Sequence, residues 1–369
     1  MTAPLVTRLE AELRESSDPA RRAEIVARIA CYQARVGDFA EARRARDELR
    51  RDFGDGRSPS VSILIMCLEA MLLYFSELDS SARDRLVRAN LLSVAFNQRP
   101  LIALTSAWQA HVEFNQARYE SMAVAVTRCL DAIDADDGTA LCRISLVLGD
   151  SMLYVNELDS SRRWYEQARI AANRLGDQAA VGAITYNRAA LHVASARLRS
   201  LNARLDKSEI AIIGAEVRTA INYQDIAQLS SLDHLLRSAG IGVLMLEERF
   251  EEASAAILKL LASSAVPGES AELSLLYADN AHCLTKIGKL ALADQMAAAA
   301  LSGVREAFDA DDRARIFGSL AQSNAARVSA QTAQTYQTSS TKALLEHQAT
   351  IARLHELLQP FVAGPTTAH

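Results

Sequence analysis

Apolar residues recur at intervals of three and four positions along most of the chain, a spacing that gathers them on one face of an α-helix. The pattern stops at short polar or glycine-containing turns and then resumes. Ile25 and Ile29 belong to one such face, Gly37 and Asp38 interrupt it, and a second helix is predicted to begin near Phe39. The alternation predicts an all-α chain built from paired helices.

One apolar residue follows each short polar turn and serves as a marker of a longer repeat. The markers are Phe39, Leu78, Tyr119, Leu158, Leu198, Phe250 and Leu290. They lie 39, 41, 39, 40, 52 and 40 residues apart. A period near 40 residues is typical of stacked helical repeats, so we expect about seven helix pairs. A globular bundle of unrelated amphipathic helices is the alternative.

The residues around two markers carry a family resemblance. Gly37-Asp38-Phe39-Ala40-Glu41-Ala42 stands at the first, and Arg249-Phe250-Glu251-Glu252-Ala253 at the sixth. This pattern resembles the tetratricopeptide repeat family over roughly residues 22–305, although that family's usual period is about 34 residues. The longer period is similar to extended repeats of bacterial regulatory proteins. The resemblance implies a right-handed α-solenoid superhelix of helix-turn-helix repeats followed by a C-terminal helix, and a HEAT-like array is the alternative geometry.

The pattern divides the chain into five expected segments. They are an N-terminal helical cap at 1–21, the solenoid at 22–305, a helical and polar connector at 306–341, a heptad-patterned helix at 342–361 and a flexible tail at 362–369. The solenoid contains one longer repeat at about 198–250. This insertion forms either a specialised lip or a longer helix pair with no separate role.

The C-terminal helix has a heptad seam. Its apolar positions include Leu344, Ile351, Leu354 and Leu358. The seam covers about two and a half heptads, which is short for a coiled coil. It therefore fits either a helix that caps the last repeat or a helix that forms a homodimer.

Composition narrows the function classes. With 15 glycines, seven prolines and a net charge of −5, the chain is poor in turn formers and has no basic excess for nucleic acid. The apolar run at 61–75 is too short to cross a bilayer and contains Glu69, so we expect a buried helix and no membrane partner. The first residues lack a signal peptide's apolar stretch, and the five scattered cysteines indicate reduced thiols. These features predict a cytoplasmic protein, and the preference for Arg over Lys suggests a bacterial source.

Sequence motifs give no support for catalysis. The chain lacks the glycine-rich phosphate loops, the hydrolase elbow and the paired-histidine zinc motif. Asp279, His282 and Cys283 have helical spacing but no second ligand cluster, so neither a metal nor a cofactor is expected. The sequence predicts a protein that is not an enzyme.

The tetratricopeptide resemblance implies a concave face lined by the first helix of each pair. The corresponding positions are Arg35, Tyr74, His111, Asn115, Arg143, Asp150, Tyr154, Tyr186, Asn187, His282 and Lys286. Amides, guanidinium groups and aromatic rings of this kind suit peptide backbones and carboxylates. The family's carboxylate clamp for chaperone tails is not reproduced. We therefore expect a scaffold that binds a protein or peptide. The alternative is a ligand-responsive sensory regulator that signals through its C-terminal helix.

Overall fold

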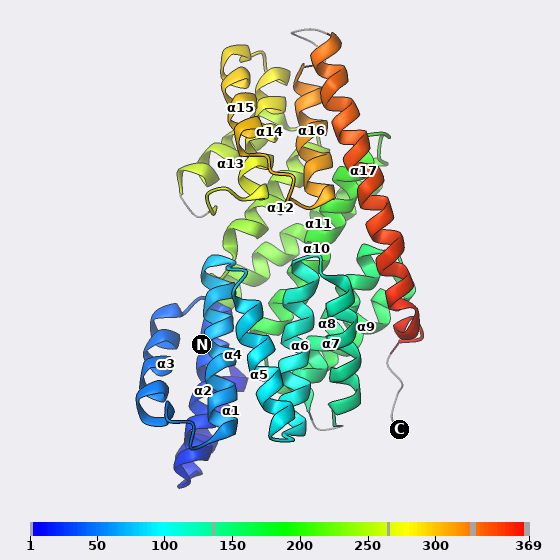
Figure 1. Cartoon of the computed structure of the whole chain (residues 1–369). Helices are drawn as coiled ribbons and strands as arrows, with labels where there is room; N and C mark the ends of the chain where they lie inside the picture. Colours follow the sequence, from blue (N-terminus) through cyan, green and yellow to red (C-terminus); the bar gives the residue numbers. More distant parts are fainter. Residues whose placement is uncertain (1–2, 135–136, 264–265, 325–329, 365–369) are drawn as a thin grey trace. The chain divides into compact units, whose positions relative to one another are not determined.

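The computed structural model describes residues 3–134, 137–263, 266–324 and 330–364. These residues form seventeen α-helices and one short 3-10 helix, and no strand occurs among them (Figure 1). The all-α prediction is confirmed. Residues 325–329 of the expected connector and 365–369 of the expected tail lie outside the described residues.

The chain divides into two compact units. Unit 1 consists of Met1–Thr185, Tyr223–Leu232 and Leu354–His369, and unit 2 consists of Tyr186–Asn222 and Asp233–Arg353. Unit 1 contains α1 (Pro4–Glu15), α2 (Pro19–Val36), α3 (Phe39–Phe53), α4 (Pro59–Glu77), α5 (Ala82–Ala95), α6 (Arg99–Asn115), α7 (Tyr119–Ala132), α8 (Gly138–Tyr154), α9 (Leu158–Leu175) and the 3-10 helix η1 (Gln359–Phe361). Unit 2 contains α12 (Asp233–Leu246), α13 (Phe250–Ala262), α14 (Ala271–Lys286), α15 (Leu290–Gly303) and α16 (Ala310–Asn324). Residues of both units occur in α10 (Gln178–Ser200), α11 (Lys207–Ala227) and α17 (Ala330–Leu358).

Consecutive helices pack as pairs within each unit. Unit 1 holds the pairs α2–α3, α4–α5, α6–α7 and α8–α9, and α4 to α9 lie side by side in Figure 1. Unit 2 holds α12–α13 and α14–α15, with α16 against α14. Some first helices of neighbouring pairs also contact each other: α2 contacts α4, and α6 contacts α8. In unit 1, α2 thus lies beside α4 and α6 beside α8, whereas the α4–α5 pair meets α6 mainly through α5.

A single turn geometry connects the helices of most pairs. A residue with positive φ ends the first helix, and these residues are Gly37, Ala117, Asn156, Glu248 and Gly288. The residue after each has φ between −97° and −82° and ψ between 63° and 70°. The next helix then begins directly, at the markers Phe39, Tyr119, Leu158, Phe250 and Leu290. The sequence repeat thus corresponds to a repeated backbone conformation.

Two markers do not begin a helix. Leu78, with φ 52°, is the residue that ends α4, and α5 begins only at Ala82. The marker at Leu198 was also placed wrongly. Leu198 is a buried residue inside α10 and follows no turn. The long interval before Phe250 instead contains the end of α10, all of α11 and all of α12. No helix is added: α10, with 23 residues, and α11, with 21, pack together as one long pair, and their length accounts for the irregular spacing.

The helix α4 forms much of the core of unit 1. It is long and apolar enough to cross a membrane by length and composition, yet 56% of its most apolar window is buried inside the chain. Its buried residues include Ile63, Leu64 and Leu68, which pack in one cluster with residues of α2 and α5. The expected buried helix is present. All five cysteines are also free and buried, as the scattered spacing predicts.

The C-terminal seam packs within the chain. Leu354 and Leu358 are fully buried, Ile351 is partly buried, and Leu344 packs with Leu198 and Ala314 of unit 2. In unit 1, Trp164 Nε1 donates a hydrogen bond of 3.0 Å to the Phe361 carbonyl oxygen. These contacts are with α9, α10 and α16, so a cap on the last repeat and the homodimer both stay predictions.

Candidate functional site

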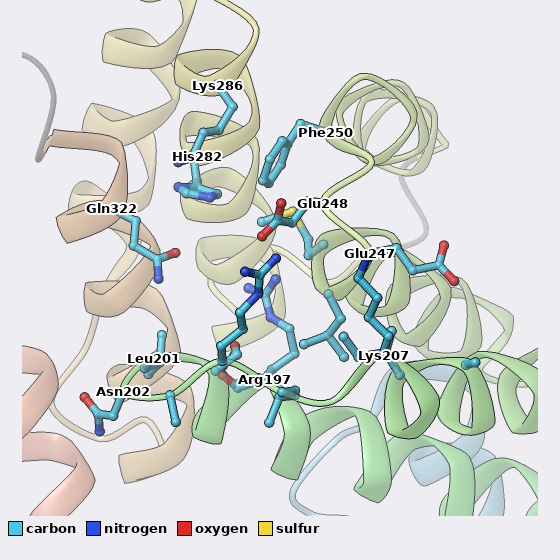
Figure 2. Close-up of a pocket in the computed structure, with 18 residues that line it drawn as sticks. Arg197, Leu201, Asn202, Lys207, Glu247, Glu248, Phe250, His282, Lys286 and Gln322 are labelled. Carbon is cyan, nitrogen blue, oxygen red and sulfur yellow. Dashed lines mark hydrogen bonds between the residues drawn. The ribbon is translucent and has the colours of Figure 1, made fainter.

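The largest described pocket lies in unit 2 and has a volume of about 1030 Å³ (Figure 2). It is formed by the end of α10, the loop 201–206, the start of α11, the turn between α12 and α13, and residues of α14 and α16. Its charged and polar lining consists of Arg197, Ser200, Asn202, Arg204, Lys207, Glu247, Glu248, His282, Lys286 and Gln322. Its apolar lining includes Leu201, Leu205, Ile210, Met245, Leu246 and Phe250.

Local sequence features fix the two turns that border the pocket. Asp206 precedes α11 and accepts hydrogen bonds from the backbone nitrogen of Ser208 at 2.6 Å and its hydroxyl at 2.7 Å. This capping interaction ends the loop 201–206 and starts the helix at Lys207. On the opposite side, Glu248 adopts φ 57°, so Phe250 begins α13 at the pocket wall.

Two of the charged side chains are already paired within unit 2. Arg197 is buried and donates a hydrogen bond of 2.5 Å to Asp279, which also accepts one of 2.6 Å from Ser319. Glu247 forms an ion pair of 2.8 Å with Arg249. These pairs neutralise one cation and one anion of the lining, so neither charge is available to a ligand without a competing partner.

Three cations of the pocket have no such partner. Arg204, Lys207 and Lys286 form no ion pair with any of the residues that the structure describes, and neither does Glu248. All four are exposed. The unpaired lining therefore has three positive charges and one negative charge at neutral pH.

An aromatic contact organises the wall between α13 and α14. The Phe250 and His282 rings are 5.3 Å apart at 79°, and Lys286 Nζ lies 5.9 Å from the Phe250 ring centroid. Figure 2 shows His282 and Lys286 projecting from the same helix toward Phe250. The cation and the ring edge are both favourable neighbours for an aromatic face.

His282 has an unsatisfied polar atom. Its side chain is only 5% exposed, and Nδ1 has no hydrogen-bond partner among the described residues. Burial lowers the pKa of His282 to about 4, although the nearby Asp279 carboxylate acts in the opposite direction. The imidazole is therefore neutral at pH 7, and its unpartnered Nδ1 is enclosed by the chain.

Seven predicted concave-face residues lie in unit 1, and several of these meet. Tyr74 of α4 packs edge-on against His111 of α6, with ring centroids 5.3 Å apart. Trp108 contacts the same histidine, and the Arg143 guanidinium of α8 lies 3.9 Å from the Trp108 ring centroid. Three successive first helices thus bring their side chains to one cluster, as the spacing predicts.

Arg143 is unusual because it is a buried cation. It is 5% exposed and forms neither a hydrogen bond nor an ion pair with the described residues. Burial, together with the charge of Arg35, lowers the pKa of Arg143 to about 10. Burial also lowers the pKa of His111 well below its usual value, and His111 Nδ1 has no described partner. The chain itself largely encloses these groups, and recognition of a partner by them stays a prediction.

The other predicted residues have different surroundings. Asp150 is buried and accepts a hydrogen bond of 2.7 Å from the Tyr165 hydroxyl. Asn115 is exposed and donates to the His111 carbonyl oxygen at 2.7 Å, while Tyr154 packs against Phe114. Arg35 is paired with a carboxylate in unit 1. Tyr186 and Asn187 are partly buried in unit 2 and do not line the pocket.

Sequence reasoning found only part of the pocket. It nominated His282 and Lys286, and it identified the interval that contains Lys207 as a candidate lip. It missed Arg204 and Phe250 as site residues. Phe250 was read only as a repeat marker, and nothing in the local pattern showed that the loop 201–206 lies beside α14.

One acidic cluster in unit 2 does not form a built site. Asp309, Asp311 and Asp312 have carboxylate oxygens close enough to share an ion. However, Arg315 pairs with both Asp311 and Asp312. Burial raises the pKa of Asp312 to about 7, which Arg315 partly opposes. The guanidinium already supplies the positive charge that these carboxylates need.

Comparison with known proteins gives no family assignment. No protein-family model matches the chain, and no curated protein matches it significantly.

Proposed function

We propose that this protein is a non-catalytic scaffold that binds a segment of a partner protein, with the unit 2 pocket as its main contact. The observation that carries the proposal is a pocket of about 1030 Å³ that combines an apolar wall with unpaired charged groups. Pockets for small ligands usually measure about 300–1,000 Å³. This pocket is at the upper end of that range, and an open site of that size suits several residues of a peptide.

The repeated architecture supports the same proposal. Recurring turns and contacts between neighbouring first helices are what a tetratricopeptide-like α-solenoid requires. In such a fold each repeat contributes a few contacts, so affinity is the sum of modest terms. We propose a solenoid of about seven pairs in a bacterial cytoplasmic protein, whose partner is a protein or peptide and not nucleic acid or membrane.

Selection from a displayed random-peptide library tests this proposal. Peptides enriched on the intact chain should bind Phe250→Ala about tenfold more weakly, because the mutation removes the aromatic wall. Lys207→Ala should also weaken binding, and it alters only an exposed side chain. Leu292→Ala, at an exposed position on α15, is the matched control. Equal binding to all the variants, or no enriched peptide, contradicts the proposal.

A sensory regulator is the second candidate, because α16 connects the pocket to α17. Gln322 of α16 lines the pocket. The same helix accepts a hydrogen bond of 2.8 Å from Ser340 of α17 at the Ala314 carbonyl oxygen, and Arg313 pairs with Glu346 at 2.5 Å. A bound peptide that displaces α16 should change amide exchange in residues 330–353. Unchanged exchange at saturating peptide rules out this transmission.

A further inference from the structure

The charge of the unit 2 pocket is opposite in sign to that of the whole chain. The protein has a net charge of −5, whereas the unpaired lining has three cations and one anion. The chain has only five lysines, and two of them, Lys207 and Lys286, line this pocket. A local positive region on an acidic protein attracts anionic groups to it.

The position of Lys207 is not explained by helix stability. Lys207 is the first residue of α11, and the amino end of a helix already has a partial positive charge. A lysine there is mildly unfavourable, and the carboxylates of Asp206 and Glu209 at the same helix end offset it. Lys207 itself is exposed, lines the pocket and adds a positive charge to its lining.

The three unpaired cations come from different elements. Arg204 lies on the loop 201–206, Lys207 on α11 and Lys286 at the end of α14. Phe250 lies between the lysine of α14 and the buried ring of His282. An apolar surface thus adjoins the cationic groups, with a neutral imidazole nitrogen beside it that lacks a partner.

We propose that this pocket recognises an acidic peptide segment, whose carboxylates pair with Arg204, Lys207 and Lys286 and whose neighbouring apolar side chain packs on Phe250. This inference rests on the proposed function and specifies its ligand. The exposed amide of Gln322 is available for the peptide backbone. Glu248, also in the lining, disfavours a compact polyanion such as a nucleotide but tolerates a peptide with spaced charges.

Fluorescence anisotropy with three pools of labelled peptides tests the inference on the intact chain. The pools share one apolar residue flanked by glutamate, by glutamine or by lysine. The glutamate pool should bind about tenfold more tightly than the glutamine pool, roughly what two or three exposed ion pairs supply. This preference should decline as salt is raised.

A charge reversal gives the sharper test. Lys207→Glu combined with Lys286→Glu should transfer the preference from the glutamate pool to the lysine pool. The control is Lys259→Glu combined with Lys342→Glu, which changes net charge equally at exposed positions outside the pocket and should leave the preference intact.

Different failures separate the two proposals. Equal binding of the glutamate and glutamine pools overturns acidic recognition but leaves peptide binding in place. Binding of no pool, with no peptide enriched from the random library, overturns both. Displacement of the glutamate pool by inorganic phosphate or ATP at lower concentrations than by unlabelled peptide overturns the peptide assignment and identifies a phosphate site.

Discussion

Arg35 of α2 and Asp177, the residue before α10, form an ion pair of 2.8 Å inside unit 1 although 142 positions separate them. Both side chains are at most 9% exposed. Asp177 also accepts a hydrogen bond of 2.9 Å from the backbone nitrogen of Ala180, so the same carboxylate caps α10. Burial is the largest influence on the pKa of Arg35 and lowers it. The charge and the hydrogen bond of Asp177, with smaller contributions from Cys142 and Tyr32, together outweigh burial, so the net shift is upward.

Breaking this pair should strongly destabilise unit 1. Arg35→Met leaves the Asp177 carboxylate buried without its cation, so we expect a loss of about 3–5 kcal/mol in the free energy of unfolding. Urea denaturation followed by circular dichroism measures it. Arg169→Ala breaks the exposed Glu166–Arg169 pair and should cost less than about 1 kcal/mol. Similar losses in the two variants would contradict this account.

Arg143→Met should have the opposite effect. The lowered pKa of about 10 corresponds to a cost of about 3 kcal/mol for keeping the Arg143 guanidinium charged in the folded protein. Its stacking on the Trp108 ring offsets about 2 kcal/mol of this cost. A methionine fills a similar volume without the charge, so stability should rise by about 1 kcal/mol. Guanidinium denaturation measures this difference. A clear loss of stability would mean that Arg143 has a stabilising acceptor, and the cost assigned to its burial would be wrong.

Gly149 should not tolerate a larger residue. A Cβ atom at this position would lie 2.9 Å from the Tyr165 ring, where α8 and α9 approach closely. Gly149→Ala should therefore reduce stability by about 1–3 kcal/mol, despite the better helix propensity of alanine. Thermal unfolding provides the measurement. Gly268→Ala is the control, because nothing lies near its Cβ position and its effect should be within about 0.5 kcal/mol.

Acid should destabilise the protein partly through His282. Its pKa is about 4 in the folded state, against an ordinary value of 6.5, so between these pH values only the unfolded chain is fully protonated there. The neutral imidazole of His282 makes its full contribution to the free energy of unfolding above pH 6.5. This contribution decreases as pH falls, and about 3 kcal/mol of it is lost at pH 4. Asp312, with a raised pKa of about 7, acts in the opposite direction over this range.

The variant His282→Gln isolates this contribution, because Asp312 is common to both proteins. The wild-type protein loses the contribution of neutral His282 as pH falls from 6.5 to 4, and the variant has no such contribution to lose. The free energies of unfolding of the two proteins should therefore converge over this range. Denaturant titrations at several pH values give the difference directly. A difference that is constant with pH would show that His282 does not titrate as its burial requires.

The sequence predicted the turns of the fold better than the depth of its side chains. Phe39, Tyr119, Leu158, Phe250 and Leu290 each begin a helix, because a polar turn followed by an apolar residue has a local structural cause. The marker at Leu198 failed because long helices such as α10 continue through a position that a regular period assigns to a turn.

Site prediction failed for a related reason. Helical spacing shows which residues share a face, and the tetratricopeptide resemblance assigned Tyr74, His111 and Arg143 to the first helices of their pairs. In the structure Tyr74 contacts His111, and Trp108 contacts both His111 and Arg143. Spacing does not show what covers that face, so the burial of Arg143 was not foreseen. The pocket was only partly found because its cations come from a loop and two helices that meet through tertiary packing.

The short turns between paired helices determine where the chain can accept additional sequence. Only two residues connect the helices at Gly37, and only three at Asn156 and at Glu248, and one residue of each connection is left-handed. Each residue inserted there would rotate the following helix by about 100°, turning its apolar stripe away from its partner. The exposed loop at 54–57, between α3 and α4, has no such strict phase relation and does not line the pocket. Epitope tags or cleavage sites are best inserted in that loop. An insertion in one of the paired turns would instead change how the two connected helices pack in the core.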